Sequence, residues 1–303
     1  MINDKFGSKQ VDFSVININI WRGGTDAFQG SDSKDTVGPE IALAKIASYV
    51  ATNLGSLDGI LGLQEIYTEV DFCESAEDGI IDGEINEANF IADMIERDWQ
   101  EVTGITRNAN IGKRANAILT NLNVEKQQVW NFAFDQNIVR DYGRFPRGAV
   151  AAKLKLPGES TFPRKLWVVC THFDGGSHEG LADPPGVVAI RQLFQALGRI
   201  KTFDPDFPVI LMGDFNIKKS LGQPYAALQH LMMQGVSGFQ EVCSHLRMYL
   251  YLYDPNKRLE IVSADDRNDP TGRTFESVTF TDHAVLKADF RWREPLKNAP
   301  IDV

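Results

Sequence analysis

The chain has 303 residues, of which 43% are hydrophobic and 24% are charged, and it contains no low-complexity run or repeat of solenoid period. These values indicate an ordered globular protein and argue against a disordered or solenoid one. The formal net charge of −10 argues against a protein that holds nucleic acid through a broad basic surface. It still allows an enzyme that meets phosphate with metal ions and a few local arginines.

The cysteine positions and the hydropathy of the chain exclude further classes of protein. Cys73, Cys170 and Cys243 are widely spaced and form no Cys-x-x-Cys pair, so we expect neither a disulfide framework nor a zinc site. No stretch approaches the roughly 18 unbroken apolar residues of a membrane span, and residues 1–5 do not begin a signal peptide. We therefore expect a soluble, cytoplasmic protein without an integral membrane segment or an obligate protein partner, unless the chain is a trimmed secreted form.

Predicted strands and helices alternate in the first half of the chain. β-Branched residues indicate a strand at 13–20, and apolar residues at helical spacing after Pro39 indicate a helix that ends at Leu54. Further along, the patterns predict a strand at 60–65, a surface loop at 67–83, a helix at 84–99, and strands at 115–120 and 147–156.

The second half continues in the same way. The patterns predict strands at 165–173, 208–212, 248–253 and 284–292, with helices around 190–197 and 225–232. No linker divides the chain, so one large α/β domain is expected. The loops at 25–38, 67–83, 174–186 and 254–277 are expected to select the ligand.

Polar, chemically active side chains stand at one end of five predicted strands. They are Asn19, Glu65, His172, Asp214 with Asn216, and Asp282 with His283. Ligands collect where strand ends from different parts of a chain converge, so these side chains predict a single site. Taken alone, Gly213-Asp214-Phe215-Asn216 fits a plain Asx turn equally well.

The contents of this predicted site indicate a type of chemistry. Carboxylate and amide oxygens without thiolates suit Mg²⁺ or Mn²⁺ better than zinc. Hydrolysis of a phosphate ester needs a cation against the phosphoryl oxygens, a carboxylate to orient or deprotonate water, and hydrogen-bond donors for the transition state. The side chains named above can supply each of these groups.

Eight short segments carry a family resemblance. They are Asn19-Ile20-Trp21, Gln64-Glu65, Asn116-Ala117-Ile118-Leu119, Arg147-Gly148-Ala149, Thr171-His172-Phe173, Arg191-Gln192, Gly213-Asp214-Phe215-Asn216 and Thr281-Asp282-His283. Together and in this order they resemble the motif set of the endonuclease/exonuclease/phosphatase superfamily. That superfamily includes deoxyribonuclease I, abasic-site endonucleases, neutral sphingomyelinases and inositol polyphosphate 5-phosphatases. The family more often has Ser where this chain has Thr281, a change that keeps the hydroxyl group.

The resemblance implies a fold and a metal site. The fold is a deoxyribonuclease I-like α/β sandwich, in which two packed mixed β-sheets are flanked by helices, as a single domain over 1–303 with its core at about 13–290. Glu65 would be the principal ligand of Mg²⁺, or of Mn²⁺, with Asn19 close beside it. Asp282 would bind a metal or fix the neighbouring histidine, and Asp214 would orient or deprotonate the attacking water.

The resemblance also assigns the groups that meet the substrate. His172 would bond the scissile phosphate or donate a proton, Asn216 would hold a phosphoryl oxygen, and His283 would stabilise the transition state. Asn116 and Arg147 are the candidate substrate-binding residues.

Two neighbouring features keep a plainer interpretation. Asn17 points to the same side as Asn19 but lies deeper in its strand, so a structural hydrogen bond is favoured over a catalytic role. The loop with Arg140, Arg144 and Arg147 fits a solvated surface as well as a phosphate-facing patch.

The leading functional hypothesis is therefore a Mg²⁺-dependent phosphodiesterase that acts on DNA or RNA. One alternative is a sphingomyelinase-like enzyme or a phosphohydrolase of inositol phosphates or phospholipids. An alternative of another class is a catalytically silent scaffold that only binds.

Overall fold

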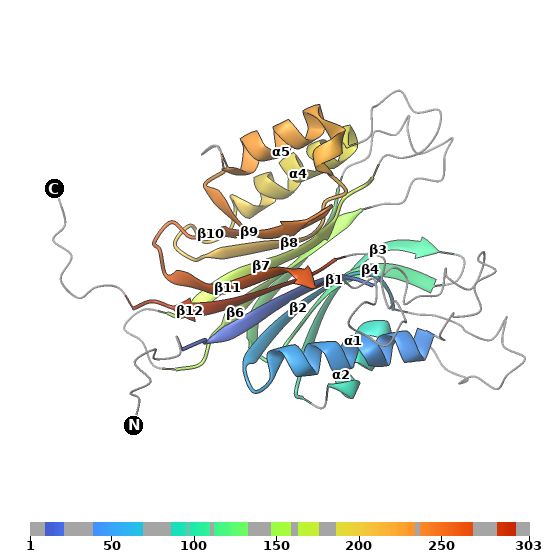
Figure 1. Cartoon of the computed structure of the whole chain (residues 1–303), viewed down its shortest axis with the longest axis vertical. Helices are drawn as coiled ribbons and strands as arrows, with labels where there is room; N and C mark the ends of the chain where they lie inside the picture. The colour runs from blue at the N-terminus through green and yellow to red at the C-terminus, as the bar shows by residue number, and fades with distance from the viewer. Residues whose placement is uncertain are drawn as a thin grey trace, which may run out of the picture.

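The computed structural model describes residues 10–20, 39–68, 86–95, 97–109, 112–132, 147–158, 163–175, 186–233, 237–268 and 284–294. Within these residues, two six-stranded β-sheets pack face to face, and helices cover their outer faces (Figure 1). This arrangement confirms the expected α/β sandwich of two mixed sheets.

The first sheet has the strand order β11-β12-β1-β2-β4-β3. Its strands are β1 (Phe13–Asn19), β2 (Asp58–Tyr67), β3 (Gln100–Ala109), β4 (Gly112–Thr120), β11 (Leu259–Asn268) and β12 (Val285–Trp292). β1 and β2 run parallel and are joined through helix α1 (Pro39–Leu54), whereas the other pairs are antiparallel. A parallel pair requires such a crossover connection.

The second sheet has the order β5-β6-β7-β8-β10-β9 and repeats this plan. Its strands are β5 (Asn123–Asn131), β6 (Gly148–Lys155), β7 (Lys165–His172), β8 (Val209–Asp214), β9 (Phe239–His245) and β10 (Met248–Tyr253). β7 and β8 are the parallel pair, joined through helix α4 (Val187–Ile200). Each sheet therefore has a parallel pair at its centre, whose carboxyl ends lie at one edge of the sandwich.

Three apolar clusters hold the layers together. One lies between the sheets and includes Val15, Ile118 and Met212. A second packs α1 and α2 (Glu87–Met94) on the first sheet, and a third packs α4 and α5 (Gln223–Met233) on the second sheet, as Figure 1 shows. None of the described helices is long and apolar enough to span a membrane.

The inward face of the central strands becomes polar toward one end. Alternate residues of a strand share a face, so the inward series are Val15, Asn17 and Asn19 in β1, Val168, Cys170 and His172 in β7, and Ile210, Met212 and Asp214 in β8. The apolar members belong to the cluster between the sheets, and the polar members continue it toward the carboxyl ends. The fold thus collects the polar strand ends at one end of the sandwich.

The strands that sequence patterns did not predict are β3, β5, β9 and β11, and these are the two edge strands of each sheet. An edge strand pairs on one side only and exposes polar residues, so it lacks the apolar run that marks a central strand. β11 occupies 259–268, so the expectation of a loop throughout 254–277 is wrong. Helix α2 ends at Met94, before the predicted end at 99, and the chain turns into β3 at Gln100.

Other predicted features are confirmed, or lie outside the described residues. Pro39–Leu54 is a helix, and the predicted central strands are all present with ends shifted by a few residues. Cys170 and Cys243 are free and buried, whereas Cys73 lies outside the described residues. The same is true of the loop at 25–38 and of most of the loops at 67–83 and 174–186.

Candidate active site

Five predicted site residues meet at the carboxyl ends of the two parallel pairs. Asn19 comes from β1, Glu65 from β2, His172 from β7, Asp214 from β8, and Asn216 from the segment after β8. The amide nitrogen of Asn19 donates to Asp214 Oδ2 at 3.1 Å and to Glu65 Oε1 at 3.4 Å. The prediction that these separate segments gather at one place is confirmed for these five residues.

Asp214 is held by donors on several sides. Only 1% of its side chain is exposed, and Oδ1 accepts the backbone N–H of Asn216 at 2.8 Å. This bond to the residue two positions ahead is an Asx turn. The segment is therefore an Asx turn that also lies at the polar end of the sandwich, so the two interpretations of its sequence are compatible. Oδ2 accepts from Asn19 and lies 3.6 Å from Nε of Arg247.

A glycine lets Asp214 approach β7. Gly213 lies opposite Thr171 in the parallel pairing and has φ 153°. A Cβ added there would lie 1.9 Å from the backbone oxygen of Thr171. Any side chain at this position would push the two strands apart, and the Gly-Asp sequence is therefore a packing requirement of the site.

Glu65 adopts an unusual backbone conformation. Its φ is 59°, and the pairing of β2 with β4 shifts register between Leu63 and Ile66, as at a β-bulge. Burial raises the pKa of the Glu65 carboxyl, but the positive charges of His172 and Arg147 outweigh it, so that the pKa lies below its usual range. Glu65 is therefore a carboxylate at neutral pH.

His172 lies against both carboxylates and against the side-chain nitrogens of Asn216 and Arg147. Its ring is 2% exposed, and Nε2 lies 3.6 Å from Glu65 Oε1 and 3.7 Å from Asp214 Oδ2. Nε2 also lies 2.9 Å from Nδ2 of Asn216, while Nδ1 lies 2.7 Å from Nη1 of Arg147. The ring is thus clamped between groups of both sheets.

The two predicted substrate-binding residues differ in position. Arg147 lies directly against His172, whereas Asn116 is 2% exposed and donates its amide to the backbone oxygen of Gly148 at 3.0 Å. This bond connects β4 of the first sheet to β6 of the second. Arg140 and Arg144 lie outside the described residues, as do Asp282 and His283, so the positions of these four are not described.

Below the site, a buried polar group confirms the structural interpretation of Asn17. Its Oδ1 accepts from Gln64 Nε2 at 2.8 Å, and its amide nitrogen donates to the backbone oxygen of Tyr249 at 3.5 Å. Gln64 also donates to the sulfur of Cys170 at 3.0 Å. Burial raises the pKa of the Cys170 thiol to about 12, so this cysteine stays protonated and is not a nucleophile.

Sequence patterns missed Arg247, which lies in the turn between β9 and β10. Its Nη1 donates to Asn216 Oδ1 at 3.3 Å, and its Nε approaches Asp214. The only sequence signal was a single basic residue before the apolar run 248–253, and a single arginine there is also ordinary surface chemistry.

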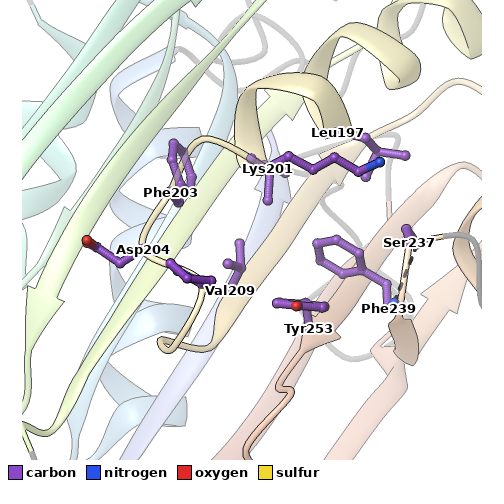
Figure 2. Close-up of a pocket in the computed structure, with 10 residues that line it drawn as sticks. Leu197, Lys201, Phe203, Asp204, Val209, Ser237, Phe239 and Tyr253 are labelled. Carbon is purple, nitrogen blue, oxygen red and sulfur yellow. Dashed lines mark hydrogen bonds between the residues drawn. The ribbon is translucent and has the colours of Figure 1, made fainter.

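A cavity of about 170 Å³ lies between the end of α4 and the second sheet. Figure 2 shows its lining, which is mostly apolar and includes Leu197, Phe203, Val209, Phe239 and Tyr253. Val209 begins β8 and Asp214 ends it, so this cavity is at the opposite end of the strand from the candidate site.

The described residues offer few ligands for a metal ion. No group of three or more His, Cys, Asp or Glu among them could hold one together. Glu65 and Asp214 supply two carboxylates, and Mg²⁺ is commonly bound by one or two carboxylates together with water and substrate phosphate. Asn19 turns its amide nitrogen toward Glu65, so an oxygen ligand at this position requires the amide to rotate by half a turn.

Comparison with known proteins gives a fold. No protein-family model and no curated protein matches the chain. Among solved structures, the endonuclease/exonuclease/phosphatase from Beutenbergia cavernae DSM 12333 matches with a TM-score of 0.62 at 14% identity, over 93% of this chain and 72% of that chain. The human Nocturnin catalytic domain with bound sulfate anion matches with a TM-score of 0.59 at 16% identity, over 93% of this chain and 94% of that chain.

A third structure, D. rerio TDP2 complexed with a single strand DNA product, matches with a TM-score of 0.58 at 14% identity, over 92% of this chain and 98% of that chain. These likenesses extend over nearly the whole chain at low identity. The chain therefore has the fold of the endonuclease/exonuclease/phosphatase superfamily, as its sequence motifs implied.

Proposed function

We propose that this chain is a Mg²⁺-dependent phosphodiesterase that hydrolyses nucleic acid by in-line attack of water. The observation that carries the proposal is the meeting of Glu65, His172, Asp214 and Asn216 at the carboxyl ends of the parallel strands, with Asn19 bonded to both carboxylates. This set contains the ligand, base and donor types that phosphate-ester hydrolysis needs.

The donor set suits Mg²⁺. Glu65 is an oxygen ligand whose lowered pKa keeps it ionised, and Cys170, the cysteine buried below the site, is protonated and accepts a hydrogen bond from Gln64 rather than offering a thiolate. In the proposal Glu65 is the principal ligand, with Asn19 beside it and Asp282 as a further candidate. When bound, the ion supplies positive charge that neutralises phosphoryl oxygens and lowers the pKa of water.

Asp214 is assigned to the attacking water. Its carboxylate is nearly fully buried and its orientation is fixed by the backbone of Asn216 and the amide of Asn19. A carboxylate fixed in this way aligns a water molecule for attack and accepts its proton. Arg247 close to Oδ2 favours the ionised form that this task requires.

His172 and Asn216 are assigned to the phosphoryl group. Their nitrogens lie in hydrogen-bond contact at 2.9 Å, so a phosphoryl oxygen that replaces this contact would meet both groups. Asn216 is fixed because its amide nitrogen donates to the backbone oxygen of Phe173 at 2.8 Å and its Oδ1 accepts from Arg247. Donors fixed before substrate arrives stabilise developing charge without reorganisation. Arg147 and Asn116 remain proposed substrate contacts, and His283 a proposed transition-state donor.

Nucleic acid is the proposed substrate class. The support is the fold shared with D. rerio TDP2, whose structure is a complex with a single strand DNA product, together with the arginines beside the candidate site. The net charge of −10 is the main argument against it. Sphingomyelin, inositol phosphates and simple binding remain the alternatives that the test separates.

The test is a substrate panel with purified protein. Plasmid DNA, single-stranded DNA, RNA, sphingomyelin, an inositol polyphosphate and bis(4-nitrophenyl) phosphate are incubated with Mg²⁺, with Mn²⁺ and with EDTA. Glu65→Gln and Asp214→Asn are each expected to lower the rate at least about a hundredfold. Asp214→Asn removes the proposed general base, and such groups contribute roughly 10²–10⁴-fold, whereas Glu65→Gln removes the proposed principal metal ligand. Asp204→Asn is the control, because Asp204 pairs with Lys153 at the surface.

Each outcome has a consequence. Cleavage of DNA or RNA that is lost in both site variants and kept in Asp204→Asn supports the proposal. Release of phosphocholine or inorganic phosphate from the lipid or inositol substrates alone would assign the site to those esters. Intact substrates throughout the panel in both metals would contradict the proposal and favour the binding scaffold.

A further inference from the structure

The turn between β9 and β10 lies beside the candidate site. His245 pairs with Met248, so Leu246 and Arg247 form a two-residue hairpin turn. Met248 in turn pairs with Asp214, and the backbone N–H of Phe215 donates to the backbone oxygen of Arg247 at 2.9 Å. The turn is therefore fixed to the segment that carries Asp214 and Asn216.

Leu246 is strained and exposed at the same time. Its φ of 53° lies in the left-handed region, and the first position of such a two-residue turn usually holds glycine, asparagine or aspartate. Its side chain is 63% exposed, more than any other large apolar side chain identified as exposed on the described surface. Neither stability nor solubility explains a leucine here, and residues with strained backbone collect at ligand-binding sites.

Arg247 faces the site rather than the solvent alone. Its guanidinium meets Asp214 through Nε at 3.6 Å and Asn216 Oδ1 through Nη1 at 3.3 Å, and 28% of its side chain is exposed. Both partners are the groups to which the attacking water and a phosphoryl oxygen are assigned. A planar guanidinium held at that position is suited to a phosphate oxygen, which it meets with two parallel donors.

We propose that this turn is a substrate-contact element of the site: Arg247 binds an oxygen of the scissile phosphate, and Leu246 packs on the apolar ring of the group esterified to it, such as a nucleobase. The inference rests on the proposed function and extends it. It adds a charged contact and an apolar contact from one turn, and it favours aromatic diesters over inorganic phosphate or small alkyl esters.

Phosphate binding tests the role of Arg247 without turnover. Inorganic phosphate is titrated calorimetrically into the Mg²⁺-loaded protein, its Arg247→Gln and Arg247→Lys variants, and Arg293→Gln. Loss of a charge-assisted bond predicts about 10- to 100-fold weaker binding in Arg247→Gln, with partial recovery in Arg247→Lys. Arg293→Gln should bind as the unchanged protein does, because Arg293 pairs with Glu260 in the first sheet.

The role of Leu246 has a matched control in the chain. Lys257 is also exposed and has φ 51°, in the turn between β10 and β11. Leu246→Gly and Lys257→Gly both relieve a left-handed backbone, so both should raise the melting temperature. Only Leu246→Gly should raise KM for bis(4-nitrophenyl) phosphate, by about fivefold, because it alone loses apolar contact area.

The outcomes separate this inference from the proposed function. Phosphate binding that depends on Arg247 in a protein that hydrolyses nothing would support the Arg247 contact and contradict the phosphodiesterase. If the protein hydrolyses a substrate but Arg247→Gln binds phosphate with unchanged affinity, the phosphodiesterase is supported and the Arg247 contact is contradicted. The turn has no role in substrate contact if Arg247→Gln keeps the phosphate affinity and Leu246→Gly keeps the KM of the protein without substitutions. The same conclusion follows if the protein without substitutions binds no phosphate.

Discussion

Single residues at the candidate site adopt backbone conformations that most side chains avoid. Glu65, Asn216 and Leu246 have φ values of 59°, 54° and 53°. Such conformations cost about 1–3 kcal/mol each and persist only where the surroundings fix them. Around Asn216 the fixing contacts are the Asx turn of Asp214 and the bond to Phe173, so part of the stability of the fold maintains the shape of the site.

Gly213→Ala is expected to destabilise the folded protein severely. The new methyl group would lie 1.9 Å from the backbone oxygen of Thr171, and neither backbone can move without breaking the pairing of β7 with β8. The free energy of unfolding should fall by more than about 4 kcal/mol, in the range of the most disruptive single substitutions. Urea unfolding followed by circular dichroism measures it.

Gly198→Ala is the matched control for this prediction. Gly198 lies inside α4, and an added Cβ meets no atom within 4 Å. The same substitution should there stabilise the protein by about 0.5–1 kcal/mol, because alanine is the better helix former. Similar stability of the two variants would show that β7 and β8 do not approach as closely as described.

At the scale of secondary-structure elements, a buried carboxylate attaches α2 to β2. Glu87 stands in the first turn of α2, is fully buried, and accepts the backbone N–H of Tyr67 at the end of β2 through Oε2 at 2.8 Å. Burial raises the pKa of Glu87 to about 8, and the Tyr67 N–H and the charge of Arg114 oppose the rise only in part. The folded protein therefore holds the neutral acid at neutral pH.

Glu87 should make the protein less stable as pH rises. Between its ordinary pKa of 4.5 and about 8, the unfolded chain has released the proton that the folded protein still holds. The contribution to stability is therefore complete below pH 4.5, falls through this window and is lost above about pH 8. Glu87→Gln should flatten this part of the profile, measured as melting temperature between pH 5 and 9.

Asp93→Asn is the control for the pH profile, because Asp93 is exposed on the same helix. Its profile should follow that of the unchanged protein over the whole range. A Glu87→Gln protein whose melting temperature keeps the same slope against pH would contradict the raised pKa.

Sequence patterns identified the elements unevenly, and the reason lies in their surroundings. Central strands such as β8 are buried on both faces, so their composition alone marks them, and α1 has both a proline start and a glycine stop. β5 has the exposure of an edge strand, with most of its residues in contact with water. Its extended conformation comes from pairing with β6, and the local amino-acid composition of β5 carries no signal of that pairing.

On the scale of the whole molecule, neither sheet contains the site by itself. Asn19 and Glu65 belong to the first sheet, and His172 and Asp214 belong to the second. The distances between them therefore depend on how the apolar cluster between the sheets packs. Met212 is central to it, since its side chain fills the space beside Gly62 of the facing sheet.

Met212→Ala should destabilise the two sheets together. The side chain is fully buried, and loss of a buried methionine costs about 2–5 kcal/mol. Because both sheets share this core, circular dichroism and tryptophan fluorescence should report one coincident unfolding transition, as expected for a single domain. Met94→Ala makes the same chemical change at a side chain that is 50% exposed, and should stay within about 0.5 kcal/mol. Separate transitions for the two probes would contradict a single cooperative domain.

The amino-acid sequence by itself determined the order of the central elements and the types of side chain at their ends, because buried strands and their polar ends are local properties of composition. It indicated Asn19, Glu65, His172, Asp214 and Asn216 before any distance was known. Only the tertiary structure decided the distances between these side chains, that Asn116 connects the two sheets, and that Arg247 joins the site. Those facts are contacts between residues far apart in the chain, and they depend on packing that no local pattern contains.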